Sequence, residues 1–334
     1  MCLRVSAPVR GRQRMAKKAL KILLVTPAPP RTRYGNRVTA LRWANLLRQL
    51  GHRASLATQY TGQQADVLIA LHAHRSFSSV QDFRADHPHR PIVVALTGTD
   101  LYRDLPDSED AQQSLRLADR LVALQPKAVE VLPASVREKM VTIYQSAPPL
   151  PKNVKKTART FDVCVVAHLR DEKEPFLASQ AAAGLAQTSQ IRVVHAGRAM
   201  NESMAAAVKV EQERNARYRW LGELPPWRVR RVMAASQAMV LSSKMEGGAN
   251  VISEAAVGHL PVLASRIPGS EGLLGDDYLG FFPPGDSEAL SELMRRIEAE
   301  PGFLKGLQAS MGEIAPLFQP QAEAKSWKDL LAAF

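Results

Sequence analysis

Two glutamates on either side of a glycine-rich loop are the side chains of this 334-residue chain whose spacing best suits chemistry. Seven residues separate Glu246 from Glu254, and Gly247 and Gly248 allow a tight turn after the first glutamate. The pattern of 241–265 predicts a strand, a loop, a short helix and a second strand. The two carboxylates are therefore expected to flank the start of a helix.

The expected helix over 251–257 makes this loop a candidate anion site. Asn250 is its expected N-cap, and Gly258 is its expected C′ residue. Free backbone N–H groups at a helix start attract anions. The candidate contacts are Gly247, Gly248, Ala249, Asn250 and Val251. An ordinary turn with solvated carboxylates is the alternative.

Positive charge follows another expected strand. The stretch HLRDEKEP at 168–175 comes directly after the apolar run FDVCVVA. Lys173 and Arg170 in this stretch supply fixed cations, which suit a phosphate-bearing ligand. A solvated surface run is the alternative interpretation.

A third group of candidates lies near the start of the chain. Arg31, Arg33 and Arg37 surround Gly35 and Asn36 just before the first expected helix. Helix amides and guanidinium groups both favour phosphate-like ligands, so we expect an anionic substrate to bind here. Solvated loop arginines are an equally good interpretation of the same residues.

Further polar residues follow two more strands of the first half. His72 and Arg75 come after VLIAL, and the loop TGTD at 97–100 comes after PIVVAL. Ligands of α/β proteins collect at the carboxyl ends of parallel strands. The loop adds four candidates for substrate contact, Thr97, Gly98, Thr99 and Asp100.

Alternating apolar runs and helical stretches predict that these residues are carried by two parallel sheets. In the first half, strands are expected at 21–26, 52–60, 66–71, 91–96, 120–124 and 141–144. In the second half, strands are expected at 161–167, 191–196, 219–221, 238–241 and 261–264. The first helix is expected at 38–50, with Val38, Leu41, Leu46, Leu47 and Leu50 on its apolar face.

The composition divides the chain into segments. A basic tail at 1–18 precedes a first domain at 19–146, and a proline- and lysine-rich linker at 147–160 leads to a second domain at 161–316. The last segment, 317–334, has a helical pattern with Trp327, Leu330 and Leu331 as its apolar side. The fold class expected from this order is α/β.

The location of the positive charges argues against nucleic acid and membrane partners. The chain carries +12, but ten of these charges lie in the acid-free segments 1–18 and 151–160, which leaves about +2 for the folded body. No apolar run is long enough to span a bilayer, and no basic patch with interleaved aromatics is present.

Cysteine usage and the tail indicate the compartment. Cys2 and Cys164 form no disulfide framework and no metal-ligand spacing, so we expect no metal. The tail lacks the apolar segment of a secretory signal, and Met15 favours an upstream extension or an alternative start. The expected location is the cytoplasm.

The Glu246 to Glu254 motif, with Lys173 upstream, resembles the donor site of family-four glycosyltransferases. The resemblance implies the GT-B architecture, in which two Rossmann-like domains with parallel sheets face each other and a C-terminal helix crosses back. It implies that Glu254 binds the ribose of a nucleotide sugar, Glu246 lies beside the sugar, and Lys173 neutralises the diphosphate. Arg170 is a weaker match, because His168 falls on the family's arginine position.

Several blocks of the first half resemble a narrower group, the selenosugar synthases of selenoneine biosynthesis. These blocks are LLVTPAPP, GNRVTALRWANLL, LIALHAHRS, PIVVALTGTDLYRD, RLVALQP and IYQSA. The resemblance implies transfer of N-acetylglucosamine or glucose from a uridine diphosphate (UDP) carrier to selenophosphate, with no cofactor. Thr99 stands where many family-four members carry a histidine, which fits an acceptor other than a sugar hydroxyl.

Three alternatives remain open from the sequence. An ordinary UDP-sugar hexosyltransferase with a hydroxyl acceptor would share the donor residues. A UDP-sugar epimerase would need no acceptor. A noncatalytic protein would use the basic tail to bind nucleic acid.

Overall fold

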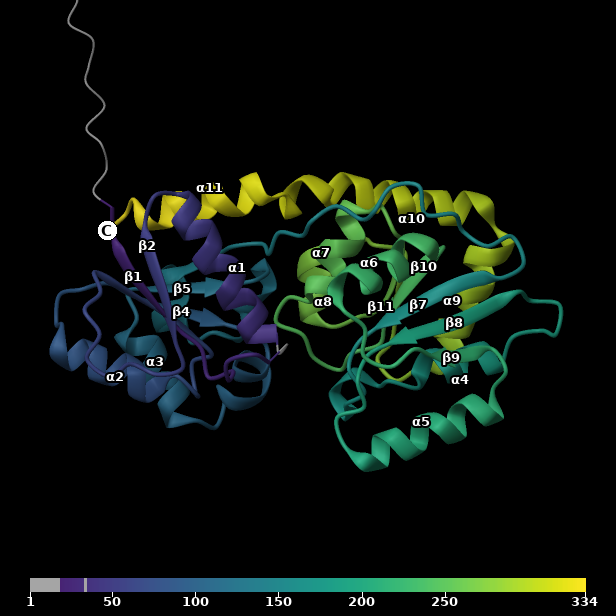
Figure 1. The fold of residues 1–334 in the computed structure, drawn as a ribbon, viewed down its shortest axis with the longest axis horizontal. Helices are drawn as coiled ribbons and strands as arrows, with labels where there is room; N and C mark the ends of the chain where they lie inside the picture. The colour runs from purple at the N-terminus through teal and green to yellow at the C-terminus, as the bar shows by residue number, and fades with distance from the viewer. Residues whose placement is uncertain (1–18, 33–34) are drawn as a thin grey trace, which may run out of the picture.

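A computed structural model describes residues 19–32 and 35–334 of the chain, and these form two lobes that each contain a six-stranded parallel sheet. The central strands of both sheets are buried apolar runs read from the sequence, because helices cover both faces of a parallel sheet. Figure 1 shows the lobes side by side, with the last two helices along one edge of both. The predicted pair of Rossmann-like sheets is confirmed.

The sheet of the first lobe has the order β2-β1-β3-β4-β5-β6. Its strands are β1 (Lys21–Val25), β2 (Arg53–Ala57), β3 (Val67–Leu71), β4 (Ile92–Leu96), β5 (Arg120–Ala123) and β6 (Met140–Thr142). Its helices are α1 (Gly35–Gln49), α2 (Phe77–Asp86), α3 (Glu109–Leu117) and the short turns η1 (Asp100–Asp104), η2 (Pro126–Val131) and η3 (Ala134–Lys139).

The sheet of the second lobe has the order β12-β11-β10-β7-β8-β9. Its strands are β7 (Phe161–Val166), β8 (Ile191–Ala196), β9 (Tyr218–Trp220), β10 (Ala238–Leu241), β11 (Val262–Ser265) and β12 (Phe281–Phe282). Its helices are η4 (Asp171–Lys173), α4 (Leu177–Ala183), α5 (Glu202–Arg214), α6 (Pro226–Ala235), α7 (Asn250–Val257), α8 (Pro268–Leu274), α9 (Ser287–Ala299) and α10 (Pro301–Ile314). The sequence pattern missed β12, because two residues are too few to show a period.

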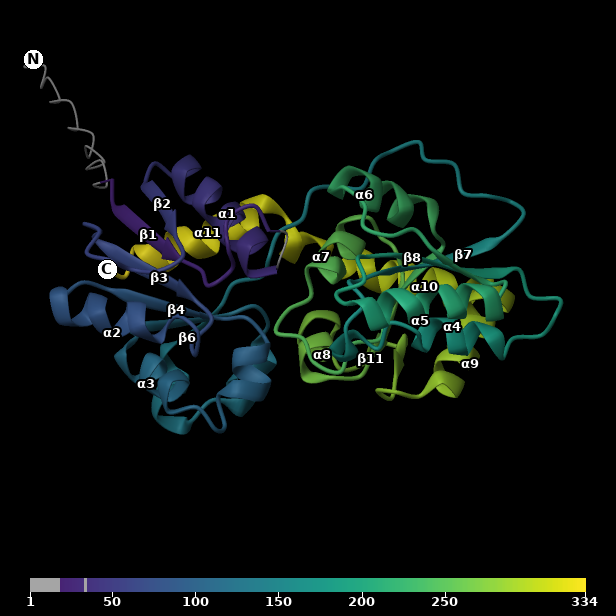
Figure 2. The same ribbon diagram turned by 60° about the horizontal axis from the view of Figure 1, so that its bottom comes forward.

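The chain crosses between the lobes twice, and the two crossings lie together. After η5 (Ala315–Phe318), α11 (Pro320–Leu331) packs on the first lobe, as the views in Figures 1 and 2 agree. Trp327 of α11 meets Trp43 of α1 edge to face, with ring centroids 4.8 Å apart. The Ala147 N–H donates to the Phe318 carbonyl at 3.1 Å and so ties the outgoing crossing to the returning one. The predicted crossover helix is confirmed.

The buried face of α1 differs from the predicted one. Val38 and Leu41 are 43 % and 44 % exposed, whereas Ala40, Trp43 and Ala44 are fully buried. The prediction is right for Leu46 and Leu47, which are buried, and wrong for Val38 and Leu41, because it counted large apolar residues and passed over the alanines that the helix turns to the core. The helix also begins at Gly35, three residues earlier than predicted.

Gly258 ends α7 as expected, but close packing and not a left-handed backbone explains the glycine. Its φ is −92°, and the left-handed residue is His259, with φ 49°. A Cβ on Gly258 would collide with the Leu150 side chain of the linker. Glycine is therefore needed here for close packing.

A buried histidine connects β8 to β9. His195 is fully buried; its Nε2–H donates to the Ala167 carbonyl at 2.9 Å, and its Nδ1 accepts from the Tyr218 hydroxyl at 2.8 Å. Burial lowers the pKa of His195 from 6.5 to about 4, since a charged ring would lose its hydration. The neutral ring is thus part of the core.

We predict that this histidine makes the fold sensitive to acid. The unfolded chain takes up the proton near pH 6.5 and the folded chain only near pH 4, so stability falls across that window by about 3 kcal/mol. The measurement is the free energy of urea unfolding against pH, for the wild type and for His195→Gln, whose amide retains one donor and one acceptor. Parallel pH curves for the two proteins would contradict the assignment.

Candidate functional site

A cleft of about 490 Å³ lies where the carboxyl ends of the two sheets face each other. In each sheet the strand order reverses at one place, between β1 and β3 in the first lobe and between β7 and β10 in the second. Loops leave such a switch point in opposite directions and open a crevice for ligands. The cleft is lined by the loops that follow these four strands, together with the loop after β4.

Most of the residues singled out from the sequence line this cleft. From the first lobe they are Gly35, Asn36, His72, Arg75, Thr97, Gly98 and Thr99. From the second lobe they are Arg170, Lys173, Glu246, Gly247, Gly248, Ala249, Asn250 and Val251. Loops that are up to 216 positions apart in the chain therefore meet in one site.

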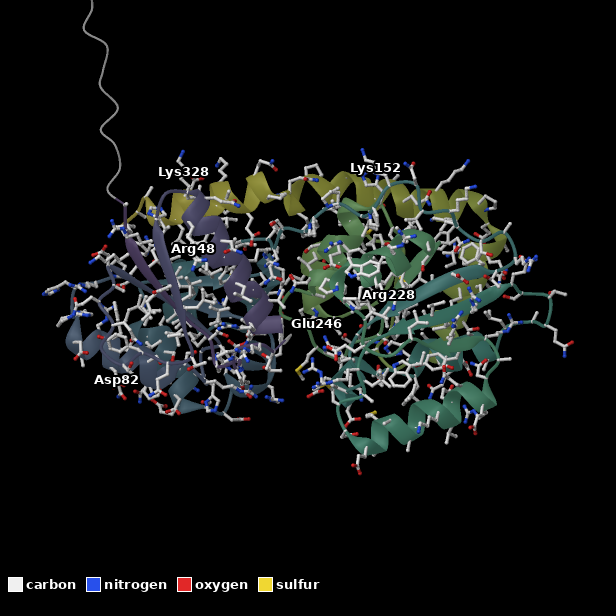
Figure 3. All side chains as sticks on the ribbon, viewed as in Figure 1. Arg48, Asp82, Lys152, Arg228, Glu246 and Lys328 are labelled. Carbon is white, nitrogen blue, oxygen red and sulfur yellow. The ribbon has the colours of Figure 1, made fainter. Side chains whose placement is uncertain are left out.

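On the wall of the second lobe, an ion pair joins two of the candidate residues. Lys173 Nζ contacts Glu246 Oε1, and the side chains are only 18 % and 12 % exposed. The Ser243 hydroxyl donates to the same carboxylate oxygen at 2.6 Å. The cation that follows β7 and the carboxylate that follows β10 thus hold each other in place at the switch point. Figure 3 shows Glu246 at the boundary between the lobes.

The start of α7 differs in detail from the prediction. Ala249 is the N-cap, and Asn250 is the first helical residue, so the predicted capping by Asn250 was wrong. The Asn250 Oδ1 instead accepts from Arg42 Nη1 of the first lobe at 3.1 Å. The loop backbone still precedes the helix, and no side chain caps its first N–H groups.

Glu254, the second glutamate of the motif, lies outside the residues that line the cleft. It is half-buried on the second turn of α7. Burial raises the pKa of Glu254, while the positive charges of Arg230 and Arg42 oppose this rise. A ligand that reaches both glutamates must therefore extend from the cleft along α7.

The lobes touch through glycine backbone. A Cβ on Gly247 would lie 2.5 Å from the Gly98 nitrogen, and one on Gly98 would lie 2.8 Å from the Gly247 nitrogen. Real Cβ atoms do not approach that closely, so both positions require glycine for this contact. A Cβ on Gly248 would also collide with the Leu124 side chain.

On the wall of the first lobe, a strained histidine orients a hydroxyl. His72 has φ 78°, in the left-handed region, and is 1 % exposed. Its Nδ1 accepts from the Arg75 N–H at 3.3 Å, so its Nε2–H donates to the Thr99 hydroxyl at 3.2 Å. Burial lowers the pKa of His72, with nearby Asp100 opposing this effect. Thr99 is left with its own proton to donate into the cleft.

Asp100 was predicted to contact the substrate, but it does not line the cleft. It is fully buried, and its carboxylate accepts from the N–H groups of Ala73, Thr97 and Gly98 at 2.8 to 3.0 Å. These bonds fix the two loops to each other. Asp100 therefore shapes the cleft wall from behind.

The arginine-rich loop also differs from the prediction. Arg31 is exposed, and neither Arg31 nor Arg37 lines the cleft; Arg33 lies outside the described residues. The cations of the first lobe that do line it are Arg75 and Arg103. Sequence reasoning missed Arg103, although it stands three positions after the TGTD loop, because the turn η1 carries it back to the cleft.

A larger depression of about 760 Å³ lies between α4 and α9, on the far side of the second lobe. Its lining contains serines, Gln180 and the surface charges Glu288, Glu292 and Arg295. Glu292 and Arg295 pair with each other across one helical turn and are 54 % exposed. The volume of this depression alone does not indicate a ligand site. The carboxyl ends of the strands, where ligands of α/β proteins bind, lie at the cleft between the lobes.

Within residues 19–32 and 35–334, no helix is long and apolar enough to cross a membrane. No group of three or more His, Cys, Asp or Glu side chains in the same residues is arranged to hold a metal ion.

Comparison with known proteins places this geometry in a class. Residues 148–317 match the family described as "Glycosyl transferases group 1". The match spans half of the chain, which therefore belongs to this family and is a glycosyltransferase.

Solved structures agree over nearly the whole chain. HepE of Anabaena, in complex with UDP-glucose, has a TM-score of 0.74 at 17 % identity, covering 94 % of this chain and 100 % of that one. A sucrose-phosphate synthase from Thermosynechococcus elongatus has a TM-score of 0.75 at 16 % identity, covering 94 % and 99 %. At these identities the likeness shows the fold, and the predicted GT-B architecture is confirmed.

We predict that the glycine contact between the lobes is needed for catalysis. In Gly247→Ala the added Cβ pushes the loop after β10 away from the loop after β4, and misplacement by about 1 Å lowers the rate of glycosyl transfer by about 100-fold. The measurement is the turnover number at saturating substrates, with thermal unfolding as a check of folding.

Gly306→Ala on α10 is the matched control, because a Cβ there meets open space. It should retain wild-type turnover. A folded Gly247→Ala protein with wild-type turnover would show that the lobes do not need this contact.

Proposed function

We propose that this glycosyltransferase takes N-acetylglucosamine or glucose from a UDP-sugar and transfers it to selenophosphate, with no cofactor. The observation that carries the proposal is the placement of cations on both walls of the cleft. Lys173 and Arg170 line the second lobe, and Arg75 and Arg103 line the first. Such a cleft suits two anionic substrates that face each other.

In this proposal the second lobe, residues 161–316, is the donor domain and the first lobe, residues 19–146, is the acceptor domain. Residues 147–160 form the linker between them. The proposed diphosphate lies at the start of α7, where loop amides and Lys173 balance its charge. The ribose then extends along α7 to Glu254, and the sugar lies beside Glu246. The UDP-glucose complex of HepE, a protein of the same fold, supports a UDP-sugar donor.

Leaving-group stabilisation is the proposed role of Lys173 and Arg170. As the bond between sugar and diphosphate breaks, negative charge grows on the diphosphate oxygens. Lys173 is already held in place by Glu246, so little reorganisation is needed at that moment. Arg170 is more exposed and supplies a second cation at the same edge.

The acceptor half rests on the first lobe. Arg75 and Arg103 are proposed to bind the phosphate of selenophosphate, in place of the Arg31 and Arg37 expected from the sequence. The Thr99 hydroxyl, whose oxygen is occupied by His72, donates to the same anion. Selenophosphate is already an anionic nucleophile and needs no general base.

The proposed reaction is a substitution at the anomeric carbon of the donor sugar. The selenium lone pair attacks the anomeric carbon and forms the C–Se bond, while the bond between that carbon and the diphosphate oxygen breaks. Its electron pair leaves with UDP. Water then cleaves the Se–P bond and gives the selenosugar and phosphate.

The experiment incubates the protein with UDP-N-acetylglucosamine or UDP-glucose and a panel of acceptors, under reducing and anaerobic conditions. We expect UDP and a selenium-linked sugar with selenophosphate, and slower reaction with thiophosphate, because sulfur is less polarisable. Mass spectrometry identifies the products. Transfer to a hydroxyl acceptor without any selenium product would favour an ordinary hexosyltransferase, and release of an epimer without an acceptor would favour an epimerase.

We predict that Arg75→Ala and Arg103→Ala each raise the KM for selenophosphate about tenfold and leave the KM for the donor within about twofold, since each loses one charged contact to the acceptor. The control is Arg53→Ala, an exposed arginine on β2 at the far edge of the sheet. An equal rise in both KM values would place these arginines in the donor site instead.

A further inference from the structure

A buried carboxylate lies where the two crossings between the lobes meet. Glu323 of α11 is 1 % exposed. One of its oxygens accepts from Trp43 Nε1 at 2.7 Å and Arg42 Nε at 3.3 Å, and the other accepts from the Ser146 N–H at 2.9 Å and the Ser146 hydroxyl. Ser146 precedes the linker, so Glu323 binds the outgoing crossing, the returning crossing and α1 together.

Arg42 of α1 links Glu323 to the first residue of α7 in the second lobe. Its Nε is held by Glu323, and its Nη1 donates to Asn250 Oδ1 at 3.1 Å. Asn250 is the first residue of α7 and lines the cleft. One guanidinium thus connects the place where the two crossings meet, about which the lobes would rotate as about a hinge, to α7 of the second lobe. Its planar fork suits two partners at fixed directions.

The charge of Arg42 also acts on Glu254. Burial raises the pKa of Glu254, and Arg230 and Arg42 are the cations that oppose the rise. Arg230 lies on α6, in the same lobe as Glu254, so a rotation of one lobe against the other does not by itself separate the two. Arg42 comes from the other lobe, so its support for the ionised carboxylate exists when the lobes are closed.

We propose that Arg42 is a positioning residue that couples closure of the lobes to binding of the nucleotide sugar along α7. Glu323 anchors it to the first lobe, so a rotation about the hinge keeps that bond and breaks the bond to Asn250. A ligand that needs ionised Glu254 then favours closure, and closure favours the ligand by the same factor. The inference rests on the proposed UDP-sugar donor and is independent of the acceptor.

The experiment compares Arg42→Ala with wild type by two readouts. The first is the distance between the lobes in the ligand-free protein, from single-molecule energy transfer between dyes on α2 and α5. The second is the dissociation constant for UDP from calorimetry. Arg42→Ala should populate a longer distance and raise the dissociation constant about tenfold. Arg42→Lys, which keeps the charge but reaches one partner at a time, should give intermediate values.

Two control variants separate coupling from general loosening. Arg48→Ala removes an arginine of the same helix whose bonds run to Ala54 and Asn45 within the first lobe, away from the boundary in Figure 3. Lys127→Ala removes a cation that pairs across the lobes with Asp276 at 2.6 Å and Glu271 at 3.2 Å and does not touch α7. Arg48→Ala should leave the dissociation constant for UDP within about twofold of wild type, and Lys127→Ala should raise it less than Arg42→Ala does, because the bond between Arg42 and Asn250 remains.

Glu323→Gln tests the anchor. It should weaken UDP binding, and the double variant with Arg42→Ala should be no weaker than Arg42→Ala alone, because both changes remove one pathway. Additive losses would overturn the coupling. So would Arg42→Ala or Arg42→Lys proteins with wild-type distances, or ones that open and still bind UDP as wild type does.

The two proposals fail in different ways. A wild-type protein that does not bind UDP would overturn the proposed donor. The distance between the lobes needs no nucleotide, so it still decides whether Arg42 holds the closed arrangement.

Discussion

The approach of two backbone segments at Gly98 and Gly247 is the constraint on which the cleft depends. These glycines belong to different lobes, and neither leaves room for a Cβ. The contact brings the loop after β4 against the loop after β10, and so sets the Thr99 hydroxyl opposite the pair of Lys173 and Glu246. Side chains longer than hydrogen at this point would separate the walls and admit water between the substrates.

The contact between the two lobes also determines how charges are arranged in the cleft. Each wall carries cations, and each has a group that holds a neighbouring side chain in one arrangement: Glu246 for Lys173, and His72 for Thr99. Because the cleft is bounded by two protein walls, charges within it are screened less than on a surface. A reaction between two anionic substrates, which repel each other in water, gains most from such a site. The proposed chemistry therefore needs fixed charge and position more than it needs an acid or a base.

Much of this could be predicted from the sequence because strands and their ends leave local patterns. The apolar runs before Lys173 and Glu246 marked both loops, and the loops are where the switch point of the sheet lies. The bond between Arg42 and Glu323 joins residues 281 positions apart and leaves no such pattern. Arg103 was missed for a local reason, because the turn η1 that carries it back to the cleft left no recognisable pattern. Val38 was misplaced because the buried face of α1 runs through Ala40, Trp43 and Ala44, and alanines are not recognised when only large apolar residues are counted.

The most direct measurement is a crystal structure of the protein with UDP bound. The diphosphate should lie at the start of α7, with an oxygen within about 3.2 Å of Lys173 Nζ and others facing the amides of the loop from Gly247 to Asn250. The ribose should contact Glu254. UDP bound in the depression between α4 and α9, or in the cleft with its diphosphate on Arg75 and Arg103 instead of Lys173, would contradict the assignment of donor and acceptor walls.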